Sequence, residues 1–105
     1  PTRIGLVVDT GYFEALGRAY RGVELLIVNT VLLQHRADHR VEHLCVAEAE
    51  AIISQVRPRC AVLTHFGMTM LRAKPWELAE ELSQRLETRV VAARDGMRLE
   101  LEALA

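Results

Sequence analysis

The amino-acid sequence predicts an α/β fold with a mainly parallel sheet, a hairpin at its C-terminal end and helices on one face. Short apolar runs at 4–8, 23–28, 60–64 and 90–93 have the length of strands. A segment with helical character lies between each run and the next. These runs are almost continuously apolar, which is typical of strands that are covered on both faces. Strands that alternate with helices favour right-handed crossovers, and neighbouring strands are then parallel.

Three segments between the apolar runs are expected to form helices. The first covers 13–20, and the second carries apolar residues at helical spacing until Pro58 ends it. The third begins near Pro75, because proline is favoured in the first turn of a helix. The stretch from 29 to 42 has no periodicity and collects polar residues, so we expect a long loop there.

The last apolar run and the alternating residues 97–101 predict a β-hairpin at the end of the chain. Between them, Asp95 and Gly96 form a pair that tolerates the positive φ angles of a tight turn. Helices placed together on one side would leave the other side of the sheet as an apolar surface. We therefore expect residues 1–105 to be a single domain that associates with a second copy or with another part of the same fold.

The composition excludes several classes of protein. A chain of 105 residues with 50% hydrophobic and 26% charged side chains is typical of a globular domain. The formal net charge of -1 comes without a basic stripe, which argues against a nucleic-acid partner. The apolar runs are far shorter than the roughly 20 residues of a membrane span. Cys45 and Cys60 lie in apolar segments, so we expect buried thiols and a reducing, cytoplasmic location.

Two polar residues directly follow predicted strands, where α/β proteins hold their functional groups. Asp9 opens a glycine-containing loop, although a turn-capping aspartate has the same pattern. His65 is expected at the edge of the sheet, with a structural histidine as the alternative. His43 precedes the second helix and either caps it or faces the loop. His35 and His39 are four residues apart in an aperiodic stretch and are expected in a solvated loop.

Four short motifs occur in an order and at intervals that resemble one protein family. They are Val7-Val8-Asp9-Thr10-Gly11-Tyr12, His43-Leu44, Leu63-Thr64-His65-Phe66-Gly67 and Ala93-Arg94-Asp95-Gly96-Met97. Together they resemble the C-terminal half of metallo-β-lactamase-fold hydrolases, particularly the branch with tRNase Z and the phosphonate-pathway cyclic phosphodiesterases. The resemblance covers nearly the whole chain. It implies one half of a four-layer αβ/βα sandwich in which two sheets pack face to face.

The resemblance implies a metal-dependent hydrolase of phosphodiesters or other esters. In this family pattern Asp9 bridges two divalent metal ions, zinc or alternatively manganese, and His65 binds one of them. His43 corresponds to the acid that protonates the leaving group. Two such ions generate a hydroxide near neutral pH and stabilise phosphoryl oxygens.

The chain also departs from the family pattern. The principal metal motif, H-x-H-x-D-H, is absent from these 105 residues, so both ions require a site completed by an N-terminal half. Asn29-Thr30 stands where phosphodiesterases commonly carry an acid, and Gly67-Met68-Thr69-Met70 replaces a Ser, Arg and Tyr pattern that clamps phosphate. We therefore expect a fragment or one piece of a split hydrolase with a small phosphoester-like substrate. The alternative is a noncatalytic half-fold module that homodimerises through its exposed sheet face.

Overall fold

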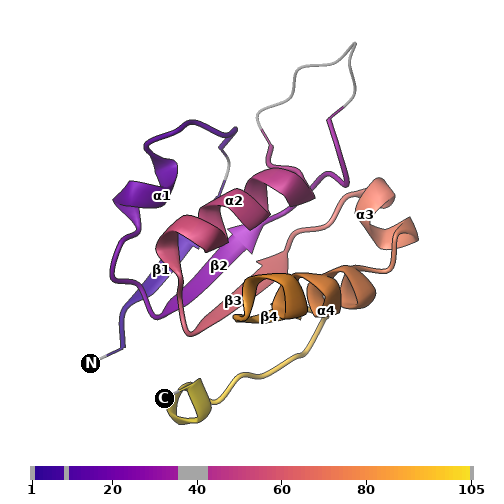
Figure 1. Ribbon diagram of the computed structural model, residues 1–105. Coiled ribbons are helices and arrows are strands. Elements are labelled where there is room, and N and C mark those ends of the chain that lie inside the picture. Colours follow the sequence, from indigo (N-terminus) through magenta and orange to yellow (C-terminus); the bar gives the residue numbers. More distant parts are fainter. Residues whose placement is uncertain (1, 9, 36–42, 105) are drawn as a thin grey trace.

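The computed structural model describes residues 2–8, 10–35 and 43–104 and arranges helices over a parallel sheet (Figure 1). The strands are β1 (Ile4–Val7), β2 (Leu25–Asn29), β3 (Cys60–Thr64) and β4 (Arg89–Ala92). The helices are α1 (Leu16–Ala19), α2 (Val46–Val56), α3 (Met68–Arg72) and α4 (Pro75–Leu86), and a 3-10 helix, η1, covers Leu101–Leu104. The strands lie in the order β1-β2-β3-β4 with parallel neighbours, which confirms the predicted parallel sheet.

Helices cover one face of this sheet, as the sequence predicts. Figure 1 shows α1, α2 and α4 on the same side of the strands. On that side Leu26, Val28 and Leu63 have no exposed surface and belong to the main apolar core. Helix α2 contributes the apolar face expected from its spacing, which consists of Ala49, Ile52, Ile53 and Val56. Each of the two isoleucine side chains and the valine side chain stabilises the fold by about 1.5–3 kcal/mol when it is fully buried.

The chain after β4 contradicts the prediction of a C-terminal hairpin. A turn in which Met97 N donates to Arg94 O at 3.0 Å follows the strand, but residues 97–100 form no strand with β4. Met97 and Leu99 instead pack on the face of the sheet away from the helices, against a second apolar cluster. That cluster consists of Leu25, Cys60 and Val62. The alternating apolar residues therefore cover part of the sheet face without adding an antiparallel strand at its edge.

The β1 end of this second face is open. Ile4, Leu6 and Val8 are 49%, 55% and 48% exposed, although they lie on or directly after a strand. β1 is also an edge strand of the sheet. Adjacent apolar side chains exposed on an edge strand are typical of a surface that another structure covers.

Three further observations refine the predicted outline. Within the predicted long loop, residues 36–42 and with them His39 lie outside the described residues, but Leu32 before them forms an isolated parallel bridge with Cys45. Between β3 and α4, where only a helix from about Pro75 is expected from the sequence, α3 is also present and its Met70 is fully buried. None of the helices in the described part of the chain has the length and apolar character needed to cross a membrane.

Candidate functional site

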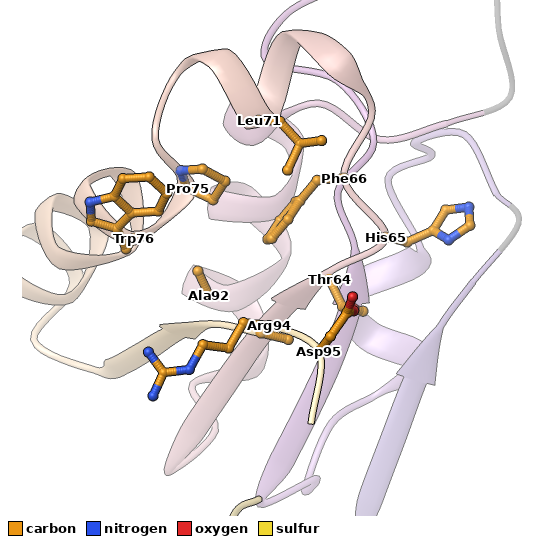
Figure 2. Close-up of a pocket in the computed structure, with 10 residues that line it drawn as sticks. Thr64, His65, Phe66, Leu71, Pro75, Trp76, Ala92, Arg94 and Asp95 are labelled. Carbon is orange, nitrogen blue, oxygen red and sulfur yellow. The ribbon is translucent and has the colours of Figure 1, made fainter. Parts of the chain in front are cut away.

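A cleft of about 700 Å³ lies at the carboxyl ends of β3 and β4 (Figure 2). Residues 64–66, which end and follow β3, line it together with Pro75 and Trp76 at the start of α4 and residues 92–95 at the end of β4. Parallel strands bring their carboxyl ends to one edge of a sheet, and α/β proteins bind ligands at that edge. The cleft is therefore the candidate site of this chain.

His65 lies at the rim of the cleft, where the sequence predicts it. Its side chain is exposed, and its backbone φ of 60° is a left-handed conformation that is uncommon for residues other than glycine. Two hydrogen bonds hold the chain around it, because Thr30 N donates to Thr64 O at 2.8 Å and Gly67 N donates to Val31 O at 2.9 Å. A Cβ at position 67 would lie 2.8 Å from that carbonyl oxygen, so the close approach requires glycine. Figure 2 shows the imidazole pointing away from the start of α4.

His43 lies beside the same edge, on the segment that leads into α2. It is half-buried, and the next residue, Leu44, accepts a hydrogen bond from Leu32 N at 3.2 Å. Val31, which precedes Leu32, accepts the hydrogen bond from Gly67 N in the loop of His65. The segments that carry the two histidines therefore flank the same short stretch of chain after β2.

Asp9, the predicted bridging ligand, lies outside the described residues. Before it, β1 ends at Val7, and β2 separates β1 from β3. Neighbouring strands are about 4.8 Å apart, so the ends of β1 and β3 are separated by roughly 10 Å. The structure thus places His43 and His65 at one edge of the sheet, while the chemical roles of Asp9, His43 and His65 stay predictions.

The donor types of His65, at this edge, and of Asp9, which follows β1 in the sequence, suit one side of a metal centre. An imidazole such as that of His65 and a carboxylate such as that of Asp9 are ordinary ligands of divalent zinc. In the described part of the chain, however, neither His65 nor His43 belongs to a group of three potential ligands. A catalytic zinc ion is usually held by three protein residues, so further ligands would have to come from another segment.

The structure also shows features that sequence reasoning missed. Trp76 is 63% exposed beside the cleft, and Arg94 contributes an exposed guanidinium group to the lining. Away from the cleft, ligand atoms of His35, Cys45 and Glu48 lie within 4.8 Å of one another. Cys45 and Glu48 have the spacing of a capping box, which is a signal in the sequence. No comparable pattern links them to His35, thirteen residues before Glu48.

Comparison with curated proteins identifies relatives that are longer than this chain, although no family model matches it. The chain is 32% identical over 101 residues to the uncharacterised protein MJ1374 of Methanocaldococcus jannaschii, an alignment that covers 93% of this chain and 36% of the relative. It is 29% identical over 103 residues to ribonuclease Z of Borreliella burgdorferi, with 93% and 32% covered. The chain therefore spans about a third of the length of the curated relatives that it matches.

Solved structures decide the fold. The metallo-β-lactamase fold protein YhfI from Bacillus subtilis superimposes with a TM-score of 0.67 and 20% identity, over 88% of this chain and 37% of that one. This chain has part of the metallo-β-lactamase fold. A diphosphatase from the PhnP family gives a TM-score of 0.67 at 17% identity, over 95% of this chain and 36% of that one. The metallo hydrolase Igni18 from Ignicoccus hospitalis gives 0.63 at 17% identity, with 87% and 37% covered.

The metallo-β-lactamase fold of this chain confirms the resemblance inferred from its four motifs. One of these motifs is Leu63-Thr64-His65-Phe66-Gly67, which in the structure runs from the end of β3 through the rim of the cleft. Another contains Arg94 and Asp95, which line the cleft from the end of β4. Two separate motifs of the metallo-β-lactamase resemblance therefore meet at one site.

Proposed function

We propose that this chain is the C-terminal part of a metal-dependent hydrolase of phosphodiesters or related esters. A second, N-terminal part with the motif H-x-H-x-D-H completes it. The observation that carries this proposal is the position of His65 and His43 at the carboxyl edge of a metallo-β-lactamase-fold sheet. The chain spans about a third of its relatives, and two of them are named ribonuclease Z and diphosphatase, which supports a phosphoester substrate.

Each candidate residue has a distinct part in the proposed reaction. Asp9 and His65 would hold the divalent ions, zinc or manganese, which supply hydroxide near neutral pH and charge stabilisation for phosphoryl oxygens. His43 donates a proton to the departing alkoxide. Arg94 binds a phosphoryl oxygen through charge-assisted hydrogen bonds. Trp76 packs against the apolar part of the substrate and excludes water from that side of the cleft.

The 105-residue chain alone is expected to be inactive on bis-p-nitrophenyl phosphate, because Asp9 and His65 are too few ligands for a catalytic metal centre at the cleft. Addition of the N-terminal part with H-x-H-x-D-H should produce turnover, measured as released p-nitrophenolate. The matched control is the His65→Ala chain, which should give little turnover in the same mixture. Turnover by the pure wild-type chain would show that the proposed half-site is wrong.

His43→Ala in the completed hydrolase is expected to lower kcat by about 10²–10⁴-fold with metal content retained, because a general acid is lost and no ligand is removed. The loss should shrink for p-nitrophenyl esters, whose leaving group needs no proton, relative to alkyl esters. Rates on both substrate types, with metal content measured on the same samples, test this expectation. An equal loss on both types would contradict an acid role. A lowered melting temperature with normal specific activity would instead indicate a structural histidine.

A noncatalytic module that forms homodimers is the second candidate function, and the open β1 face favours it. Ile4, Leu6 and Val8 of two copies could cover one another without any N-terminal part. Metal stoichiometry separates the two candidates. A hydrolase binds metal through Asp9 and His65 once it is complete, whereas a dimeric module binds none through these residues.

A further inference from the structure

Three side chains with metal-binding atoms meet where the segment after β2 lies beside the start of α2. His35 Nε2, Cys45 Sγ and a carboxylate oxygen of Glu48 all lie within 4.8 Å of one another. The distance between His35 Nε2 and Glu48 Oε1 is 2.7 Å. Leu32, which forms a bridge with Cys45, holds the two segments together. None of the three side chains is a predicted ligand of the hydrolytic centre.

We propose that His35, Cys45 and Glu48 form a zinc site that is separate from the hydrolytic centre. Imidazole nitrogen, thiolate sulfur and carboxylate oxygen are the three donor types that zinc binds in proteins. Zinc–ligand bonds of about 2.0–2.3 Å place the donor atoms of a tetrahedral site roughly 3.5 Å apart. The distance between the imidazole nitrogen and the carboxylate oxygen therefore has to increase by about an ångström, and no pair of donor atoms has to approach by more than about an ångström.

The cluster is accessible to a cation from solvent although its sulfur is buried. Cys45 is 6% exposed, whereas the side chains of His35 and Glu48 are 36% and 25% exposed. A zinc ion with these three protein ligands can keep a water molecule as its fourth ligand on the exposed side. Burial, with a smaller contribution from the Glu48 charge, raises the pKa of the Cys45 thiol. The thiol therefore carries its proton in the absence of a cation, and zinc binding releases that proton.

Helix capping explains part of this arrangement but not all of it. Cys45 N donates to Glu48 Oε1 at 3.1 Å, and the Cys45 side chain accepts from the Glu48 backbone, which forms a capping box at the start of α2. Serine, threonine, asparagine and aspartate are the residues preferred at such a position. Capping thus accounts for Glu48, but it requires neither a thiol at position 45 nor an imidazole at position 35. A zinc site requires all three.

The test is a titration of the reduced, metal-free 105-residue chain with Co²⁺, a spectroscopic substitute for zinc that gives a thiolate-to-cobalt absorption band. We expect one equivalent of Co²⁺ to produce the band, and zinc to displace it and to raise the melting temperature. Cys45→Ser keeps an oxygen for the helix cap but lacks the thiolate. This variant should melt at the same or a higher temperature and lose the band. His35→Ala and Glu48→Gln should each weaken Co²⁺ binding by at least about 10-fold, because even outer-shell partners contribute about 10–100-fold.

Cys60→Ala is the matched control, because Cys60 is also a free, buried cysteine but belongs to no such group in the described chain. It should keep the band. Absence of the band in the wild-type chain, or an unchanged band in Cys45→Ser, would overturn the proposed site. Wild-type affinity in both His35→Ala and Glu48→Gln would overturn it as well. These outcomes leave the hydrolase proposal untouched, because that proposal depends on Asp9 and His65.

Discussion

Asp9→Ala in the complete hydrolase is expected to abolish most of the activity, and His65→Ala is expected to have a smaller but still large effect. The negative carboxylate of Asp9 is predicted to bind both cations and partly neutralise their charge, whereas His65 is a neutral ligand of one cation. Both losses should exceed the roughly 10²–10⁴-fold cost of removing a general acid, because the ions supply the hydroxide and stabilise the phosphoryl oxygens. Metal content after dialysis and kcat, measured on the same preparations, should fall together. The melting temperature should change little for His65→Ala, since this side chain is exposed.

Asp9→Asn is the matched variant for the first of these changes. Asparagine preserves the size of the side chain and its ability to cap a turn, but it removes the negative charge. If Asp9 only capped the turn, Asp9→Asn would have nearly normal activity, metal content and melting temperature. Asp9→Ala would then have a lower melting temperature with unchanged specific activity. A metal ligand predicts the opposite, with both variants depleted of metal. Full metal occupancy in both Asp9→Ala and His65→Ala would show that the metal assignment is wrong.

Leu6→Lys is expected to convert the isolated chain from an associating species into a monomer. Leu6 is 55% exposed at the centre of the open β1 face, between Ile4 and Val8. Burial of its exposed part contributes about 1 kcal/mol per copy, so two copies correspond to roughly 10–100-fold in a dimer dissociation constant. Burial of an unpaired lysine charge adds a further cost. Sedimentation over a range of concentrations, together with binding of a hydrophobic dye, measures the effect.

The control for this change is Leu71→Lys. Leu71 is 52% exposed on α3, which lies away from β1, so its replacement should leave association unchanged. The same Leu6→Lys change should also weaken capture of the N-terminal part in the proposed hydrolase. A wild-type chain that sediments as a monomer at all concentrations and binds no dye would contradict a docking role for this face.

The parallel strands could be predicted because continuous apolar runs indicate burial on both faces, and in the structure β2 and β3 are buried in this way. The hairpin could not be predicted correctly, because alternation reports only which side chains face an apolar surface. Met97 and Leu99 satisfy that pattern by lying on the sheet face, without backbone pairing at its edge. Helix α3 has five residues, which is too short for helical periodicity to be visible.

The candidate site could be predicted in part for a similar reason. The end of β3 places His65 at the sheet edge whatever its backbone angles are, so strand boundaries are sufficient to locate it. The walls of the cleft depend instead on how α4 packs beside β4, and Trp76 therefore gives no signal in the sequence. The cluster of His35 with Cys45 and Glu48 depends on the bridge between Leu32 and Cys45, a contact between distant residues.

The strands lie side by side in the same order in which the chain forms them, so the direction of winding never reverses within the described sheet. Right-handed connections then deliver each helix to the same side. Doubly wound sheets begin in the middle and wind both ways, which covers both sides and opens a ligand crevice where the direction changes. A sheet wound in one direction has no such reversal point, and its cleft lies instead beside the ends of β3 and β4. In the proposed hydrolase, the N-terminal part that docks on the free side would enclose this cleft from outside. Assembly and completion of the site then become a single event, and damage to docking at β1 should lower activity at His65, two strands away.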